Sequence, residues 1–131
     1  FNPSGSISHR QLWMVLARFM GVYPSDMEAA RIWAVENGFA VGTNPVSPVT
    51  RQQLVVALYR TARLSGSLNG NTASLAKYED SRLVSASARN AMSWAVANGI
   101  ISGNANACLN PNGTVTRDQF AVILFRFSQR R

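Results

Sequence analysis

The fold is decided by the stretch Asn110-Pro111-Asn112-Gly113-Thr114-Val115-Thr116-Arg117-Asp118-Gln119-Phe120. Pro111 and Gly113 predict a turn, and the hydroxyl of Thr116 is placed to cap a helix that begins at the next residue. Gln119, three residues after the cap, is placed to accept a hydrogen bond from the amide of Thr116, which completes a capping box. Arg117 then occupies the first helical position, where the helix dipole is unfavourable for a cation. Helix stability does not explain a cation there, which raises the question of an acidic ligand.

Weaker copies of this stretch occur twice more in the chain. They are Phe1-Asn2-Pro3-Ser4-Gly5-Ser6-Ile7-Ser8-His9-Arg10-Gln11-Leu12 and Asn44-Pro45-Val46-Ser47-Pro48-Val49-Thr50-Arg51-Gln52-Gln53-Leu54. Each copy has its own capping box, Ser8 with Gln11 and Thr50 with Gln53. Apolar residues at helical spacing follow each box. The sequence therefore predicts helices at about residues 9–20, 51–63 and 117–129. Arginines also align near the three helix ends, where a cation suits the dipole; they are Arg18, Arg60 and Arg126.

A second repeated unit lies between these helices. Residues 32–42 read IWAVENGFAVG, and residues 93–103 read SWAVANGIISG. In both units a Trp-Ala-Val helix ends at Asn-Gly, which is typical of a left-handed helix terminus. A short apolar pair and a second glycine follow each terminus.

The starts of these two helices are predicted from local cap signals. We expect the first to begin with a capping box of Ser25 and Glu28, and the second to begin at Ser85 or Ser87. The preceding segment, Leu64 to Tyr78, is rich in Gly, Ser, Asn and Thr and is typical of a surface connection.

The repeats predict an all-α fold, a pseudo-threefold helical bundle of helix–loop–helix repeats. One repeat alone cannot bury its apolar face, so the three capped helices are expected to pack together. We interpret residues 1–131 as a single domain, with a partial motif at 1–21, a second motif at 22–64 and a third at 65–131. Because the chain begins at Phe1, we expect it to be a piece of a longer protein.

The charge of the chain indicates an acidic partner. The formal net charge is +7, from 13 Lys and Arg against 6 Asp and Glu, and Lys77 is the only lysine. Arginine favours planar, bidentate contact with carboxylates and phosphates. Nucleic acid, an anionic polysaccharide and a charged membrane surface are all compatible with this composition. The alternative is that the charge merely aids solubility.

The residue inventory argues against an enzyme or a metal site. Cys108 is the only cysteine and His9 the only histidine, so a disulfide, a zinc site or a nucleophile–histidine pair has almost nothing to draw on. We therefore predict no catalytic residue, no metal and no cofactor. No apolar run approaches the roughly 20 residues that a membrane span needs, so membrane insertion is not expected.

The third unit resembles an S-layer homology (SLH) motif. That family's pattern runs Phe-x-Asp, a Trp helix, Gly-Ile-x-x-Gly, Phe-x-Pro, and Thr-Arg-Ala-Glu opening a helix. The matching residues here are Tyr78-Glu79-Asp80, Trp94, Gly99-Ile100-Ile101-Ser102-Gly103, Leu109-Asn110-Pro111 and Thr116-Arg117-Asp118-Gln119. Residues 78–129 follow the pattern nearly end to end, residues 24–63 follow it with deletions, and residues 1–20 match its last third.

The resemblance implies a secreted bacterial module of the cell wall or S-layer. Such modules hold a parent protein non-covalently on secondary cell-wall polysaccharides attached to peptidoglycan, which are often pyruvylated. Their ligand grooves lie between adjacent motifs, and the arginine of Thr-Arg-Ala-Glu contacts the acidic sugar. Carried over by matching position, the carbohydrate-binding residues are Arg51, Arg117, Asp80, Trp94, Gly103, Trp33 and Gly42.

Three departures from the family pattern affect these expectations. His9 stands where the arginine of the first copy is expected, so we expect its groove to be weak, altered or inactive. Glutamine replaces the family glutamate in all three copies, which keeps the cap and loses a charge. The first motif lacks its front half, which leaves open truncation or completion by self-association with another chain.

Structural explanations compete with several of these site assignments. A Trp on the apolar face of a helix is usually part of the core, and Asp80 is also placed to cap the next helix or to pair with Arg82. Two other functions stay open, a basic helical nucleic-acid binder and an assembly module that has lost its ligand. Against the former, the arginines are spread over the repeats and aromatic residues rarely alternate with them, so nucleic acid is not the expected partner.

Overall fold

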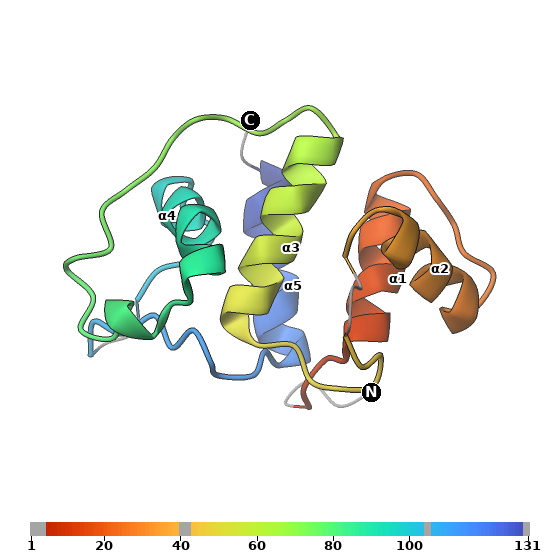
Figure 1. Ribbon diagram of the computed structural model, residues 1–131, viewed down its shortest axis with the longest axis horizontal. Coiled ribbons are helices and arrows are strands. Elements are labelled where there is room, and N and C mark those ends of the chain that lie inside the picture. The colour runs from red at the N-terminus through yellow and green to blue at the C-terminus, as the bar shows by residue number, and fades with distance from the viewer. Residues whose placement is uncertain (1–4, 40–42, 104–105, 130–131) are drawn as a thin grey trace.

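The computed structural model describes residues 5–39, 43–103 and 106–129, and every regular element within these ranges is a helix. The predicted all-α class is confirmed. Figure 1 shows α3 near the centre, the α1–α2 pair on one side and α4 on the other. The elements are α1 (His9–Phe19), α2 (Met27–Glu36), α3 (Arg51–Leu64), the short 3₁₀ turns η1 (Ser81–Leu83) and η2 (Ala86–Ala88), α4 (Arg89–Ala97) and α5 (Arg117–Gln129).

The three predicted capping boxes are all present. The amide of Gln11 donates to Ser8 Oγ at 3.3 Å, and Gln11 Oε1 accepts from the amide of Ser8 at 2.8 Å. The same reciprocal pair closes α3 at 3.2 and 2.9 Å and α5 at 3.1 and 3.0 Å. Each box satisfies amides that a helix start would otherwise leave without partners, and the predicted helix ranges agree with those observed.

The segments before the three capped helices meet in a closed ring of hydrogen bonds. The amide of Ile7 donates to the carbonyl of Val115 at 3.0 Å, and the amide of Val115 donates to the carbonyl of Val49 at 2.9 Å. The amide of Val49 donates to the carbonyl of Ile7 at 3.0 Å, which closes the ring. All three side chains are buried. The ring gives the bundle its pseudo-threefold arrangement.

A second set of hydrogen bonds links the same three copies, with donors and acceptors in the opposite order around the ring. The first backbone amide of each capped helix donates to a carbonyl in another copy. That carbonyl lies two residues before Ile7, Val49 or Val115, the three residues that form the ring. The three bonds are Arg117 to Gly5 at 3.0 Å, Arg51 to Gly113 at 2.9 Å and His9 to Ser47 at 3.1 Å. These bonds place the N-terminal end of each capped helix beside the preceding loop of another repeat.

The α2 helix begins differently from the sequence prediction. Its N-cap is Asp26, whose carboxylate accepts from the amide of Ala29 at 2.8 Å, so the predicted Ser25–Glu28 box is wrong. A carboxylate one residue later provides an equally good cap and also suits the positive end of the helix dipole. The chain enters α4 through η2, which spans one of its two predicted starts, Ser87.

The predicted left-handed helix ends are confirmed. Gly38 has φ of +82° and Gly99 has φ of +69°, values that suit glycine. The Nδ2 groups of Asn37 and Asn98 each donate to a tryptophan carbonyl in the preceding turn at 2.8 Å. Both loops that leave the Trp helices therefore begin with the same geometry.

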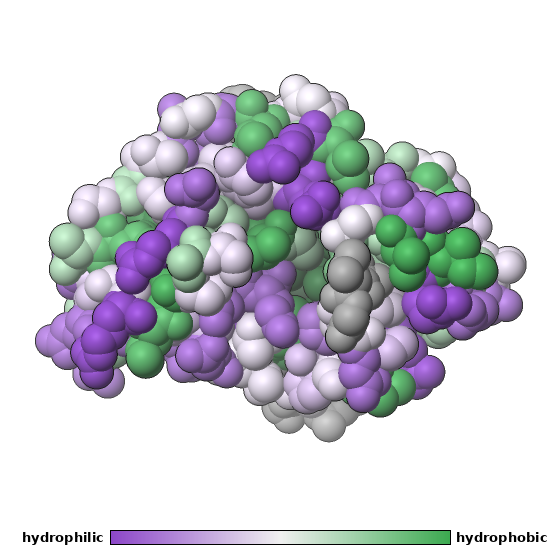
Figure 2. Space-filling model, viewed as in Figure 1, coloured by the Kyte–Doolittle hydropathy of each residue, from purple (hydrophilic) through white to green (hydrophobic). Residues whose placement is uncertain are grey.

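The core is built mainly on α3, α4 and α5, with Trp94 at 1% exposure among its largest residues. A smaller cluster joins α1 to α2 around Trp13, and both Trp33 and Phe39 pack against the two clusters. Part of α2 stays exposed: Figure 2 shows hydrophobic side chains at the surface on the α1–α2 side. Apolar packing therefore connects the α1–α2 pair to the rest of the bundle.

Candidate functional site

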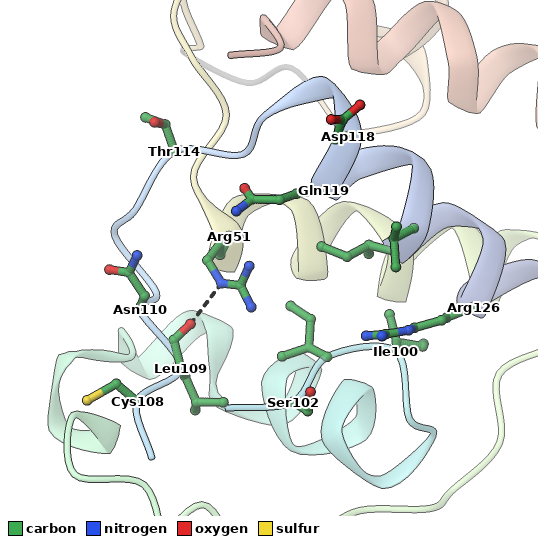
Figure 3. A pocket seen from close by; sticks show the side chains of 13 residues that line it. Arg51, Ile100, Ser102, Cys108, Leu109, Asn110, Thr114, Asp118, Gln119 and Arg126 are labelled. Atoms are coloured by element: carbon green, nitrogen blue, oxygen red, sulfur yellow. Dashed lines mark hydrogen bonds between the residues drawn. The ribbon is translucent and has the colours of Figure 1, made fainter. Parts of the chain in front are cut away.

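Groove 1 is a cavity of about 430 Å³ between the N-terminal end of α3 and one face of α5. The loop that follows α4 forms its remaining wall (Figure 3). Its lining residues are Arg51, Ile100, Ile101, Ser102, Cys108, Leu109, Asn110, Thr114, Asp118, Gln119, Val122, Ile123 and Arg126.

Two arginines dominate the chemistry of groove 1. Arg51 reaches in from α3 and Arg126 from α5, and both guanidinium groups point into the cavity (Figure 3). Arg51 donates its Nε hydrogen to the carbonyl of Leu109 at 2.8 Å. Burial lowers the pKa of Arg51, and the nearby charge of Asp80 opposes that shift. Because an arginine still keeps its proton, Arg51 is a partly buried, fixed cation.

Asp80 holds the loop that orients Arg51. Its two carboxylate oxygens accept from the backbone amides of Leu109 and Asn110, each at 2.8 Å. Asn110 has φ of +53°, a left-handed conformation that asparagine tolerates. Asp80 makes no side-chain cap to η1. Its observed contacts are thus with this loop, which in turn presents the Leu109 carbonyl to Arg51.

The rest of groove 1 combines apolar and polar surfaces. Ile100 and Ile101 are almost fully buried behind the cavity, whereas Val122 is 49% exposed on α5. Asp118 also belongs to the wall, with its carboxylate turned away from the two guanidinium groups (Figure 3). The groove therefore suits a ligand with an anionic group and an apolar face.

Several residues assigned from the resemblance do not line groove 1. Trp94 is a core residue, and Trp33 is partly buried and stacks on Phe39 with ring centroids 5.2 Å apart. Gly103 lies against the ring of Tyr78: a Cβ there would stand 2.6 Å from a ring carbon. Gly42 lies outside the described residues.

The two arginines at matching helix starts differ in position. Arg51 lies in groove 1, whereas Arg117 lines neither groove described here, and its backbone amide bonds to Gly5. Sequence reasoning missed Arg126 and Cys108 as groove residues. The signal available for Arg126 was its alignment with Arg60. That alignment was explained by the helix dipole, which favours a cation near a helix end, and so no binding role was assigned to Arg126.

Groove 2 is a cavity of about 520 Å³ between α1 and one face of α3. His9 stands at the position that Arg51 has in groove 1, and Arg60 at the position of Arg126. Burial lowers the pKa of His9, and a hydrogen bond with the side chain of Gln53 partly opposes this. The lining residues are His9, Leu12, Trp13, Gly38, Phe39, Thr43, Thr50, Gln52, Gln53, Val56, Ala57, Arg60, Ser85, Ser87, Ala88 and Asn112.

Among the described residues, no three His, Cys, Asp or Glu side chains gather where they would hold a metal ion. Within the same ranges, no helix has both the length and the apolar character that crossing a membrane requires.

The chain is similar to a family model, to a known surface-layer protein and to part of a solved structure. Residues 77–121 match the model of the S-layer homology domain. Over 100 residues the chain is 33% identical to the Surface-layer 125 kDa protein of Lysinibacillus sphaericus, an alignment that covers 70% of this chain and 8% of that protein. The fold is similar to part of the undecaheme cytochrome from the S-layer of Carboxydothermus ferrireducens, with a TM-score of 0.59 and 19% identity. That match covers 98% of this chain and 17% of the cytochrome chain.

Proposed function

We propose that this chain holds its parent protein on an acidic cell-wall glycan. Residues 77–121 match the model of the S-layer homology domain, a type of module that anchors proteins at the cell surface. The ligand is a secondary cell-wall polysaccharide whose sugars carry a pyruvyl ketal, and binding is non-covalent and non-catalytic. Groove 1 is the site. The parent protein is displayed on the bacterial cell wall or S-layer.

The observation that carries this proposal is the convergence of Arg51 and Arg126 in one cavity from two different helices. A ketal carboxylate is planar and accepts paired hydrogen bonds, the geometry that a guanidinium group provides. Each charge-assisted bond contributes ~1.5–3 kcal/mol. The ketal also carries a methyl group, for which the exposed side chain of Val122 offers apolar contact.

Preorganisation of Arg51 supports the same assignment. The loop that accepts its Nε hydrogen is itself fixed by the two bonds from Asp80. A side chain that is already oriented loses less conformational entropy when the ligand binds. Asp80 therefore acts as a positioning residue rather than as a contact with the sugar.

The test is sedimentation of the chain with purified bacterial cell walls that carry pyruvylated polysaccharide. The unaltered chain is expected to sediment with these walls and to sediment much less after chemical removal of pyruvate. Arg51→Ala is expected to lose most binding. The matched control is Arg82→Ala, which removes the same charge at an exposed position outside both grooves.

Two outcomes would contradict the proposal. One is equal sedimentation with intact and depyruvylated walls. The other is binding to duplex DNA that weakens steeply with salt and no binding to walls, which would favour a nucleic-acid partner.

A further inference from the structure

The two grooves are related by the pseudo-threefold arrangement, yet they differ in the number of cations that line them. In groove 1 the matching positions hold two arginines and an aspartate, whereas in groove 2 only one arginine remains. Burial keeps the imidazole of His9 neutral over more of the pH range than usual. The matching pairs are Arg51 with His9, Asp118 with Gln52, Gln119 with Gln53, and Arg126 with Arg60.

Groove 2 also has an additional polar wall. Ser85, Ser87 and Asn112 line it from the segment before α4 and the turn before α5. Gln52 fixes this wall: its Nε2 donates to Asn112 Oδ1 at 2.7 Å, and its Oε1 accepts from the amide of Ser85 at 3.0 Å. Hydroxyl and amide groups held in this way match the hydroxyl groups of a sugar.

We propose that groove 2 binds an uncharged sugar residue of the glycan whose acidic residue occupies groove 1. This inference rests on the proposed function of groove 1. A carboxylate in groove 2 would meet one guanidinium group, that of Arg60, and the neutral imidazole of His9, whereas in groove 1 it would meet two guanidinium groups. The replacement of an arginine by a histidine does not weaken the binding of an uncharged sugar, because hydroxyl groups pair well with neutral amides and hydroxyls.

Apolar surface in groove 2 supports the same ligand class. Phe39 is partly buried against Trp33 and lines the groove together with Val56. A pyranose ring has an apolar face, and ligand sites commonly pair such a surface with a few fixed polar groups. Groove 2 has both within a cavity of about 520 Å³.

A matched pair of substitutions separates the two grooves. Ser87 and Ser102 are both exposed, and they line groove 2 and groove 1 respectively. A tryptophan at either position fills one groove and leaves the other untouched. Binding is measured by calorimetry with a pyruvylated oligosaccharide of the wall polymer and with the same oligosaccharide after depyruvylation.

Ser87→Trp is expected to weaken binding of the depyruvylated oligosaccharide about tenfold or more, while Ser102→Trp leaves that binding unchanged. The inference is overturned if Ser87→Trp leaves the depyruvylated oligosaccharide bound as before. Failure of Ser102→Trp to weaken the pyruvylated oligosaccharide would instead overturn the proposed function of groove 1. The two failures are therefore distinguishable.

Discussion

Arg51 donates a hydrogen bond to the carbonyl oxygen of Leu109 across 2.8 Å, a contact between residues 58 positions apart in the chain. It joins the start of α3 to the loop of the following repeat. Because the guanidinium group is held before any ligand arrives, the loop and the arginine form one unit. Changes in the loop are therefore expected to alter binding at Arg51.

The first prediction concerns Asp80. Asp80→Asn replaces an acceptor of two backbone amides by a group that satisfies at most one of them, so the loop loses about 2 kcal/mol of stabilisation. We expect a lower melting temperature by circular dichroism together with weaker wall binding. Glu79→Gln, an exposed neighbour with the same loss of charge, is the control. Equal melting temperatures for the Asp80 variant and the unaltered chain would show that the two hydrogen bonds to Asp80 do not stabilise the loop.

The second prediction concerns the reactivity of Cys108. Burial raises its pKa above the ordinary value of 9.0, and the negative charges of Asp80 and Glu79 raise it further. The thiolate therefore forms at higher pH in the folded chain than in the chain unfolded by urea. Alkylation rates measured against pH should show a higher midpoint in the folded state. Coincident midpoints would disprove the predicted environment.

The third prediction concerns the pH dependence of stability. Burial lowers the pKa of His9 below the ordinary 6.5, so between the two pKa values the unfolded chain binds more protons than the folded chain. Stability is then full above the unfolded pKa and declines as the pH falls below about 6.5. Urea unfolding at about pH 7.5 and at about pH 5 measures this decline. His9→Gln is expected to show a smaller decline, and an equal one would show that another group is responsible.

The fourth prediction separates scaffold from site. Thr116→Ala removes a helix cap and is expected to lower the free energy of unfolding by ~1 kcal/mol. Thr116 lines neither groove described here, so wall binding should persist at temperatures where the variant stays folded. Loss of binding by the folded variant would mean that the cap itself shapes the site.

The local parts of this fold were predictable from the sequence because their chemistry is local. A capping box spans four consecutive residues and an Asn-Gly terminus spans two, so all the residues that form each motif can be read from one short stretch of sequence. The start of α2 was mistaken because Ser25 and Asp26 are both good caps, and the choice between them depends on their surroundings. The start of α4 was predicted only as a choice of two residues, since no side chain caps it.

The site was less predictable because it depends on contacts between repeats. Arg51 was found from its unfavourable position at a helix start and from the resemblance. Arg126 enters the same groove from the C-terminal part of α5, and only the packing of α5 beside the loop that follows α4 reveals this. The role of Asp80 depends on residues 29 and 30 positions away.

The central claim is that Arg51 recognises the pyruvyl carboxylate, and a double-mutant cycle tests it most directly. Calorimetry would compare the unaltered chain and Arg51→Ala, each with the pyruvylated and the depyruvylated oligosaccharide. Removing either partner from the interaction is expected to lower affinity roughly tenfold to a hundredfold. If the claim holds, removing both costs little more than removing one. If the two losses simply add, Arg51 and the pyruvyl group do not interact, and the claim is contradicted.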